Sequence, residues 1–232
     1  MDKKSVAAPD FAAPLGTTNR SLPEQICDHI RELIIDGTLE AGTWLRERDL
    51  AQRLNVSRIP VREALPVLEA EGFVRMVPRR GAMVTTLTLR EAENLYDIRE
   101  SLEVLAARLA ARQARHSPPV ALLECLERGR AAAEAGDRHG VEAANAAFHG
   151  EILKLSDNPL LQSIMKPIKG RVRWLFHLLP SRDPHSQLLK HQELCDAIAS
   201  GNPDLAAAVA YAQIVRTRES SLAVLRTLLP ES

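Results

Sequence analysis

One stretch of the chain, residues 46–62 (RERDLAQRLNVSRIPVR), restricts the possible folds more than any other. The segment ERDLAQRL predicts a short helix, and a second run of helical character begins after only three further residues, NVS. Asn55 is suited to the left-handed backbone of a tight turn, and Ser57 is suited to cap the helix that follows. The stretch therefore predicts two helices joined by a tight turn.

The flanking sequence extends this unit on both sides. Apolar residues recur at i, i+4, i+7 and i+8 in a helix that ends at Gly37, at Ile26, Ile30, Leu33 and Ile34. After the turn, RIPVREALPVLEAEG predicts a third helix to Gly72, and FVRMV and AMVTTL predict two short strands around the basic turn PRRG. Residues 21–87 are thus predicted to form a winged helix-turn-helix with a small β-hairpin wing, and residues 1–20 a flexible N-terminal arm.

Every element from Thr88 onward is predicted to be helical. Thr88 and Glu91 have capping-box spacing. A capping residue followed by proline marks four more starts, at Ser117–Pro118, Asn158–Pro159, Asp183–Pro184 and Asn202–Pro203. With a start at Asp137, the expected helices lie near 88–115, 118–135, 137–156, 159–179, 184–200 and 203–229. Because short loops favour antiparallel neighbours, residues 88–232 are predicted to form a C-terminal antiparallel six-helix bundle in a mainly α chain.

Composition agrees with packed helices and limits the partners. Hydrophobic residues make up 45% of the chain but aromatic residues only 3%, and strands favour β-branched and aromatic side chains. Lys+Arg and Asp+Glu are 30 each, so nucleic-acid binding must rest on local charge. Three widely spaced cysteines, the lack of a long apolar run and the lack of a signal-peptide pattern predict a cytoplasmic protein with no membrane association.

Local positive charge is concentrated on the helix-turn-helix. Residues 46–62 contain five arginines, Arg46, Arg48, Arg53, Arg58 and Arg62. Arg58 and Arg62 stand at i and i+4, so both project from one face at the start of the third helix, where arginine can contact guanine edges and phosphates. Any one surface arginine can simply solvate its helix. Together with Arg79 and Arg80 in the wing, the set predicts binding to double-stranded DNA.

The segment from Ile34 to Val84 resembles the DNA-binding domain of the GntR family of bacterial transcription regulators. The shared motifs are G-x-L-x-x-G-x-x-L, L-A-x-x-L, S-R-x-P-V-R-E-A-L, L-E-x-E-G and R-G in the wing, and the resemblance covers residues 22–87. It implies that operator DNA is contacted by Arg48, Ser57, Arg58 and Arg62, together with Arg80 and Gly81 of the wing.

The helical segment resembles the FCD (FadR/VanR-like) effector domain that accompanies this module in one GntR subfamily. The resemblance is carried by LYDIRESLEVLAARLAA, NAAFHGEILKLSDNPLL and HQELCDAIASGNPDLAAAVA. It implies a homodimer and a small organic acid effector, often bound through a metal. The family's metal set is an aspartate, a histidine four residues later and two further histidines, and the matching positions here are Asn145, His149, His191 and Gln213.

These four residues fall on predicted inward faces of their helices, so a shared polar effector site is expected. Only His149 and His191 are strong metal ligands, because Asn145 and Gln213 offer neutral carbonyl oxygens in place of the usual Asp and His. A site for a divalent metal such as Zn²⁺ therefore looks degenerate, although an acidic effector could complete the shell.

Arg99 is a further inward candidate, because Leu95 and Leu102 share its helix face. A guanidinium in an apolar setting requires an anionic partner. Either an internal acid supplies it, or Arg99 binds the carboxylate of the effector.

The pattern as a whole predicts a dimeric repressor that binds a pseudo-palindromic operator under the control of the effector. A metal-dependent enzyme is the first alternative, but no carboxylate accompanies the histidines as a general base, and no Ser-His-Asp, Cys-His or Gly-rich phosphate motif occurs. We therefore expect no enzyme activity. A ligand-free architectural DNA-binding protein is the second alternative, and the neutral net charge and the expected buried polar residues count against it.

Overall fold

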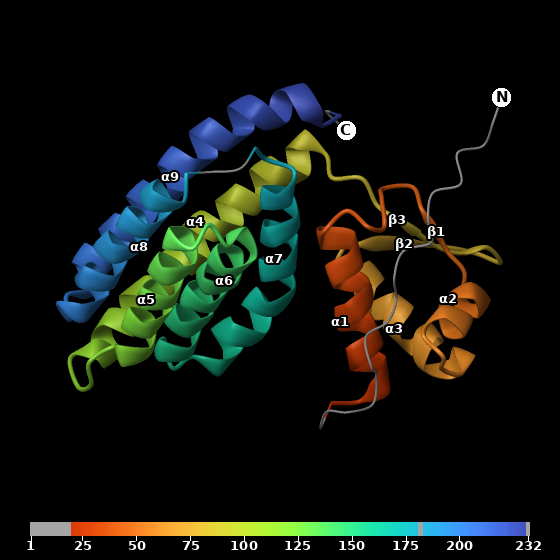
Figure 1. The fold of residues 1–232 in the computed structure, drawn as a ribbon, viewed down its shortest axis with the longest axis horizontal. Coiled ribbons are helices and arrows are strands. Elements are labelled where there is room, and N and C mark those ends of the chain that lie inside the picture. Colours follow the sequence, from red (N-terminus) through yellow and green to blue (C-terminus); the bar gives the residue numbers. More distant parts are fainter. Residues whose placement is uncertain (1–19, 181–182, 231–232) are drawn as a thin grey trace. The chain divides into compact units, whose positions relative to one another are not determined.

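The computed structural model describes residues 20–180 and 183–230, so the expected N-terminal arm lies outside the described residues except for Arg20. The chain divides into two compact units. The first unit runs to Leu87 and also takes in Pro167–Leu178, and the second consists of Thr88–Lys166 and the chain from Leu179 onward. The elements of both are labelled in Figure 1.

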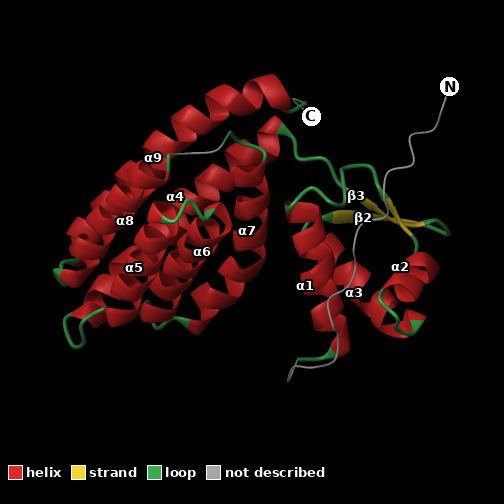
Figure 2. Ribbon diagram, in the orientation of Figure 1, coloured by secondary structure: helices red, strands yellow, loops and turns green. Residues whose placement is uncertain are grey.

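The first unit has the predicted winged helix-turn-helix arrangement. Its elements are α1 (Leu22–Ile35), β1 (Trp44–Leu45), α2 (Glu47–Arg53), α3 (Arg58–Ala70), β2 (Val74–Val77) and β3 (Gly81–Val84). The strands form an antiparallel sheet in the order β1-β3-β2, drawn in yellow in Figure 2. The two-residue strand β1 was not predicted, because it is too short to show an alternating pattern.

The core of the first unit lies between α1 and α3, which pack against each other. On α1, Ile26 and Ile30 are fully buried, as the i, i+4 pattern predicts, and on α3 Val61 and Leu65 are fully buried. Each such side chain contributes about 1.5–3 kcal/mol when removed from water. The apolar face of α3 is thereby fixed toward α1, and its arginine-bearing face is left to solvent.

The second half of α7 (Pro159–His177) is grouped with the first unit. Trp174 stacks on Phe73, with 5.5 Å between ring centroids, and Arg173 makes two 2.7 Å contacts with the carboxylate of Glu32. The helix continues through Pro167. The expected domains, residues 21–87 and 88–232, differ from these two units in the placement of Pro167–Leu178, and the domain division stays a prediction.

The helical region contains the six predicted helices within the part of the chain that is described. Besides α7 they are α4 (Leu89–Ala114), α5 (Val120–Glu134), α6 (Arg138–Leu155), α8 (Pro184–Ala199) and α9 (Pro203–Leu228). In the second unit α4 packs along α9, α5 packs against α6, and α8 contacts both α5 and α9. None of the described helices combines the length and the apolar character that a bilayer-spanning segment needs.

Side-chain caps account for most of the helix starts. Thr88 accepts a hydrogen bond from the Glu91 backbone, Asp137 from Gly140, and Asn202 from Asp204 and Leu205. The predicted start at Ser117–Pro118 was wrong, because α5 begins at Val120 with Pro119 at the N-cap. A residue that precedes a proline is biased away from the helical conformation, and Pro118 precedes Pro119.

Gly81 closes the wing against β1. Its φ is +101°, and a Cβ at this position would lie 2.6 Å from the backbone oxygen of Leu45. Gly42, in the same unit, has a similar φ of +82° but no atom within 4 Å of the corresponding position. A comparison of the two positions therefore distinguishes the cost of a left-handed backbone, which both share, from the cost of steric overlap, which, of the two, arises at Gly81.

We predict that Gly81→Ala lowers the free energy of unfolding of the first unit more than Gly42→Ala does. Gly42→Ala should cost about 1 kcal/mol from the left-handed backbone alone, and Gly81→Ala at least about twice that, since β1 must also shift. Urea unfolding followed by tryptophan fluorescence measures the difference, because both tryptophans lie in this unit. Equal losses in the two variants would contradict the steric argument.

Candidate DNA interface and effector site

The turn between α2 and α3 has the predicted geometry. Asn55 adopts a left-handed conformation with φ +53°, and Ser57 is the N-cap residue of α3 with an extended backbone. The Ser57 side chain makes no capping hydrogen bond, contrary to the expectation that it caps the helix, and it is exposed. Its hydroxyl and the first N–H groups of α3 therefore face solvent together, in an arrangement suited to phosphate.

The arginines predicted to contact DNA lie on α2, on α3 and in the wing. Arg48 has an 81% exposed side chain, and its Nε lies 3.5 Å from Asp49. Arg58 and Arg62 are both exposed on the face of α3 opposite its buried residues, and Arg80 is exposed next to Gly81 in the wing. The structure thus places every predicted DNA-contacting residue in the first unit, and their contacts with DNA stay a prediction.

Glu47 is a residue of this surface whose role was missed from the sequence. Its carboxylate accepts hydrogen bonds from Nε and Nη2 of Arg62, the latter at 2.8 Å, and the pair joins the start of α2 to α3. The Arg62 side chain is 65% exposed, so the pair is a solvated one. If DNA contacts Arg62 as predicted, it competes with Glu47 for this side chain, which makes Glu47 a candidate determinant of selectivity.

The predicted effector residues lie in the second unit. The rings of His149 on α6 and His191 on α8 are perpendicular, with 5.2 Å between centroids. Phe148 stacks on His191 at 4.6 Å. Gln213 on α9 donates a hydrogen bond from Nε2 to the Lys190 backbone oxygen at 2.7 Å, directly beside His191. The structure therefore brings His149 and His191 together and holds the amide of Gln213 against the same segment of α8.

Asn145 and His191 line a small cavity between α5, α6 and α8. Its volume is about 10 Å³, which corresponds to one water molecule. Gly129 lines it as well, and a Cβ added there would lie 3.0 Å from Cδ2 of Leu188. The three helices therefore pack closely around the candidate site.

Burial strongly affects the protonation of His191. Burial first, and then the nearby His149 and Lys190, lower the pKa of His191 from 6.5 to about 3. The imidazole is therefore neutral near pH 7, with one nitrogen able to donate and the other able to accept.

The residues present do not fit the tight metal centre that the family resemblance implies. Among the described residues no group of three or more His, Cys, Asp or Glu side chains is arranged to hold a metal. The donors at the predicted site are two imidazoles and the amides of Asn145 and Gln213, and amide oxygens are weak ligands for Zn²⁺. The site is better suited to hydrogen bonding.

Arg99 on α4 is buried, as predicted, with 5% of its surface exposed. Its Nε lies 2.7 Å from Oε1 of Glu103, and its guanidinium lies 5.1 Å from the centre of the Tyr96 ring. Of the two possibilities left open by the sequence, the structure shows the internal acid. A role for Arg99 in effector binding stays a proposal.

We predict that Glu47→Gln releases Arg62 and reduces selectivity. Binding to random-sequence duplex should strengthen, and the slope of log K against log salt should steepen by about 1, because one more arginine becomes available to a phosphate. Fluorescence anisotropy across a salt series measures both quantities. Glu63→Gln, which removes an exposed acid from α3 with the same change of charge, is the matched control. Equal effects of the two variants would show that the ion pair with Arg62 has no special role.

We predict that metal-free protein loses stability as the pH falls from about 6.5 toward 3 in a way that depends on His191. The folded state holds this imidazole neutral while the unfolded chain binds a proton below about pH 6.5, so acid favours unfolding. Urea unfolding followed by circular dichroism at several pH values, after dialysis against a chelator, measures the effect. His191→Phe should flatten the pH dependence, and His185→Phe, at an exposed position, should leave it unchanged.

Two protein-family models match the chain. Residues 22–84 match the model described as bacterial regulatory proteins, gntR family, and residues 94–216 match the FCD domain. The first match covers the helix-turn-helix and all three strands, and the second covers all of the candidate effector residues.

Individual proteins show the same similarity. The "Probable D-xylose utilization operon transcriptional repressor" of Paenarthrobacter nicotinovorans is 30% identical over 190 residues, which is 82% of this chain and 84% of that protein. The gluconate operon transcriptional repressor of Bacillus subtilis is 30% identical over 145 residues, 62% of this chain and 59% of that protein. A solved GntR regulator from Rhodococcus sp. RHA1 matches with a TM-score of 0.72 and 26% identity, covering 88% of this chain and 99% of the other.

Proposed function

The chain belongs to the GntR family of bacterial regulatory proteins and carries an FCD domain, and we propose that it is a dimeric repressor that releases its operator when a small organic acid binds to the helical domain. The observation that carries this proposal is the solvent-exposed arginine face of α3, next to a wing, in a chain that also has a helical domain with a half-buried polar site. Residues 21–87 would be the DNA-binding domain and residues 88–232 the effector-binding and dimerisation domain.

On DNA, α3 of each protomer would enter the major groove, and two half-sites one helical turn apart would form a pseudo-palindrome. Arg58 and Arg62 would read base edges, Arg48 and Ser57 would contact phosphates, and the wing would add Arg80 with a close backbone approach at Gly81. Support comes from the exposure of these side chains and the free N–H groups at the start of α3.

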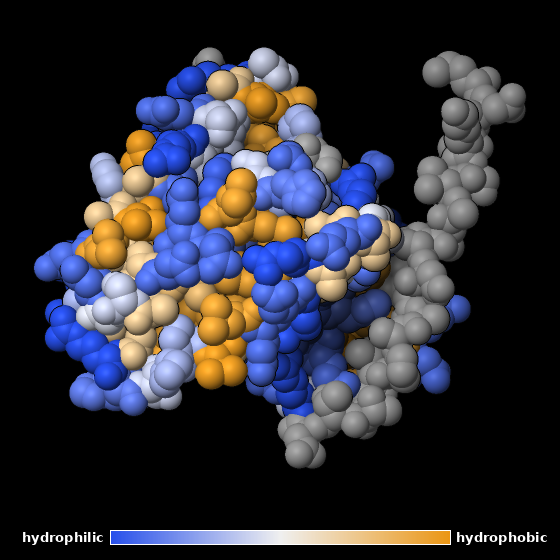
Figure 3. All heavy atoms as spheres, turned by 60° about the vertical axis from the view of Figure 1, so that its left-hand side comes forward, coloured by the Kyte–Doolittle hydropathy of each residue, from blue (hydrophilic) through white to orange (hydrophobic). Residues whose placement is uncertain are grey.

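A homodimer would cover apolar surface that remains on the helical unit. Apolar side chains, drawn in orange, lie at the surface on the face shown in Figure 3. Large apolar residues of α8 and α9 are strongly exposed, namely Leu189 at 68%, Tyr211 at 51% and Leu205 at 45%. Such side chains are common where subunits meet.

The effector would bind where Asn145, His149, His191 and Gln213 gather, with Arg99 as a further candidate. The cavity of about 10 Å³ is far smaller than the pocket of about 300 Å³ or more that a small ligand requires. Binding would therefore require α5 to separate from α6 and α8, and the liganded and free states would differ in helix packing. A ligand that selects one of two packing states can shift an equilibrium elsewhere in the chain. We propose that the neutral imidazole of His191, together with His149 and the two amides, binds the acid directly, without a tightly held metal.

We predict that a screen of gluconate, other sugar acids and small carboxylic acids finds a ligand that raises the melting temperature and weakens DNA binding. The sugar acids are included because two relatives are named as repressors of D-xylose and gluconate operons. The DNA is a duplex selected by the protein from a random-sequence library, and metal content is measured on the same preparation by mass spectrometry.

His191→Phe keeps the ring that stacks on Phe148 and should abolish the thermal shift while leaving DNA affinity in the absence of acid unchanged. His185→Phe, at an exposed position of the same helix, should retain the shift. A stabilising acid that leaves DNA affinity unchanged would overturn the proposed regulation, and stoichiometric metal in the purified protein would overturn the direct binding of the acid.

A further inference from the structure

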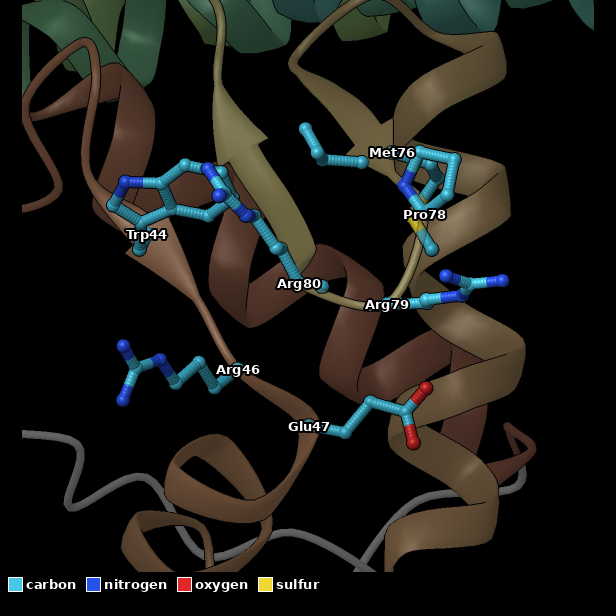
Figure 4. A pocket seen from close by; sticks show the side chains of 9 residues that line it. Trp44, Arg46, Glu47, Met76, Pro78, Arg79 and Arg80 are labelled. Atoms are coloured by element: carbon cyan, nitrogen blue, oxygen red, sulfur yellow. The ribbon is translucent and has the colours of Figure 1, made fainter.

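A groove in the first unit is lined by Trp44 of β1, by the two residues that follow β1, and by residues 76–81 of the wing hairpin. Its volume is about 830 Å³. Figure 4 shows Trp44 and Arg46 on one side of it, Met76 and Pro78 on the other, and the wing arginines beside the hairpin turn. The family resemblance implies DNA contacts for Arg80 and Gly81 at the wing side of this groove, but it assigns no role to Trp44, Met76 or Pro78.

Trp44 supplies the largest apolar surface of the groove. Its exposed fraction is 42%, whereas Leu45, the next residue of β1, is 2% exposed. Trp44 is paired with Met83 of β3, and the Thr43 backbone oxygen accepts a 3.0 Å hydrogen bond from the Val84 N–H. The backbone thus holds the indole outward on a fixed strand. An ordered, exposed tryptophan is typical of a binding surface.

Charge in the groove selects an anionic occupant. Arg46, Arg79 and Arg80 line it, and Glu47 is the acid among its lining residues. Three arginines against one carboxylate leave the groove with a net positive charge, whether Glu47 stays paired with Arg62 or releases it to DNA. The same ion pair places Arg62 of α3 against a residue that lines the groove.

We propose that this groove binds the sugar–phosphate backbone of DNA beside the half-site that α3 contacts, with Trp44 packed against deoxyribose. This inference rests on the proposed DNA contacts of α3. The arginines suit phosphates. The bases of a duplex are stacked on one another and reaching them requires unstacking, so the apolar surface open to Trp44, Met76 and Pro78 is that of the sugars. Trp44 would then extend the footprint beyond the bases that α3 reads.

The test compares two duplexes that share one selected core. The long duplex extends about one helical turn (about 10 base pairs) beyond each half-site, and the short duplex ends at the half-sites. Affinities of the full-length protein are measured by anisotropy at one salt concentration. Trp44→Ala should weaken binding to the long duplex about tenfold and leave the short duplex unaffected, and Trp44→Phe should lose less. Val120→Ala, which truncates an exposed apolar residue of α5, is the control and should change neither affinity.

Two further readouts keep the proposal independent of folding defects. Adding the long duplex should change the indole emission of the wild type, and Trp44→Phe should lose that change while Trp174 remains as the internal reference. Arg46→Ala should reduce the salt slope by about 1 on the long duplex alone.

The possible outcomes distinguish a failure of the proposed function from a failure of the groove to contact DNA. If the wild type binds neither duplex, the proposed function itself fails. If the wild type binds both and Trp44→Ala binds the long duplex equally well, the groove is not a DNA contact. An equal emission change with inorganic phosphate alone would identify a small-anion site and would also overturn the proposal.

Discussion

The burial of one face of α3 against α1 is the constraint on which the DNA-binding surface depends. Ile30 of α1 and Val61 and Leu65 of α3 are fully buried, and these contacts fix the rotation of α3 about its own axis. Since Arg58 and Arg62 lie on the remaining face, their exposure is a consequence of the core and not of any contact that they make themselves. A rotation of α3 that buried the arginines would expose leucine and valine to water, at about 1.5–3 kcal/mol for each side chain.

Helix α7 contributes its second half to the packing of that core. It begins with residues of the second unit and continues without a break into residues grouped with the first. In its second half, Trp174 stacks on Phe73 at the start of the wing, and Gly170 lies so close that an added Cβ would be 3.1 Å from the same ring. The Arg173–Glu32 pair adds a contact with α1.

The elements that the sequence predicted well are those whose signal is local. The helix starting after Thr88 was predicted correctly because its cap lies within one turn. The start of α5 was misplaced because two prolines compete for one position and Pro119 decides the outcome through its effect on Pro118. β1 escaped prediction because two residues show no period. The Glu47–Arg62 pair joins residues 15 apart, and such a contact depends on how α2 crosses α3, which side-chain periodicity does not report.

At the candidate effector site too, the sequence predicted what depends on residue spacing and did not predict what depends on helix packing. Helical spacing and the family resemblance identified His149 and His191, and the structure brings their rings together. The small volume beside them was not predictable, because it depends on how closely Gly129 lets α5 approach α6 and α8. That volume bears on the proposed sign of control. If the proposed effector binds there, it must open a site that is closed in this structure, so part of its binding energy is spent on repacking helices and only the remainder is measured as affinity. If the closed state is the one that holds the operator, a ligand that binds only the open state draws the protein away from the DNA-binding state, and the ligand acts as an inducer.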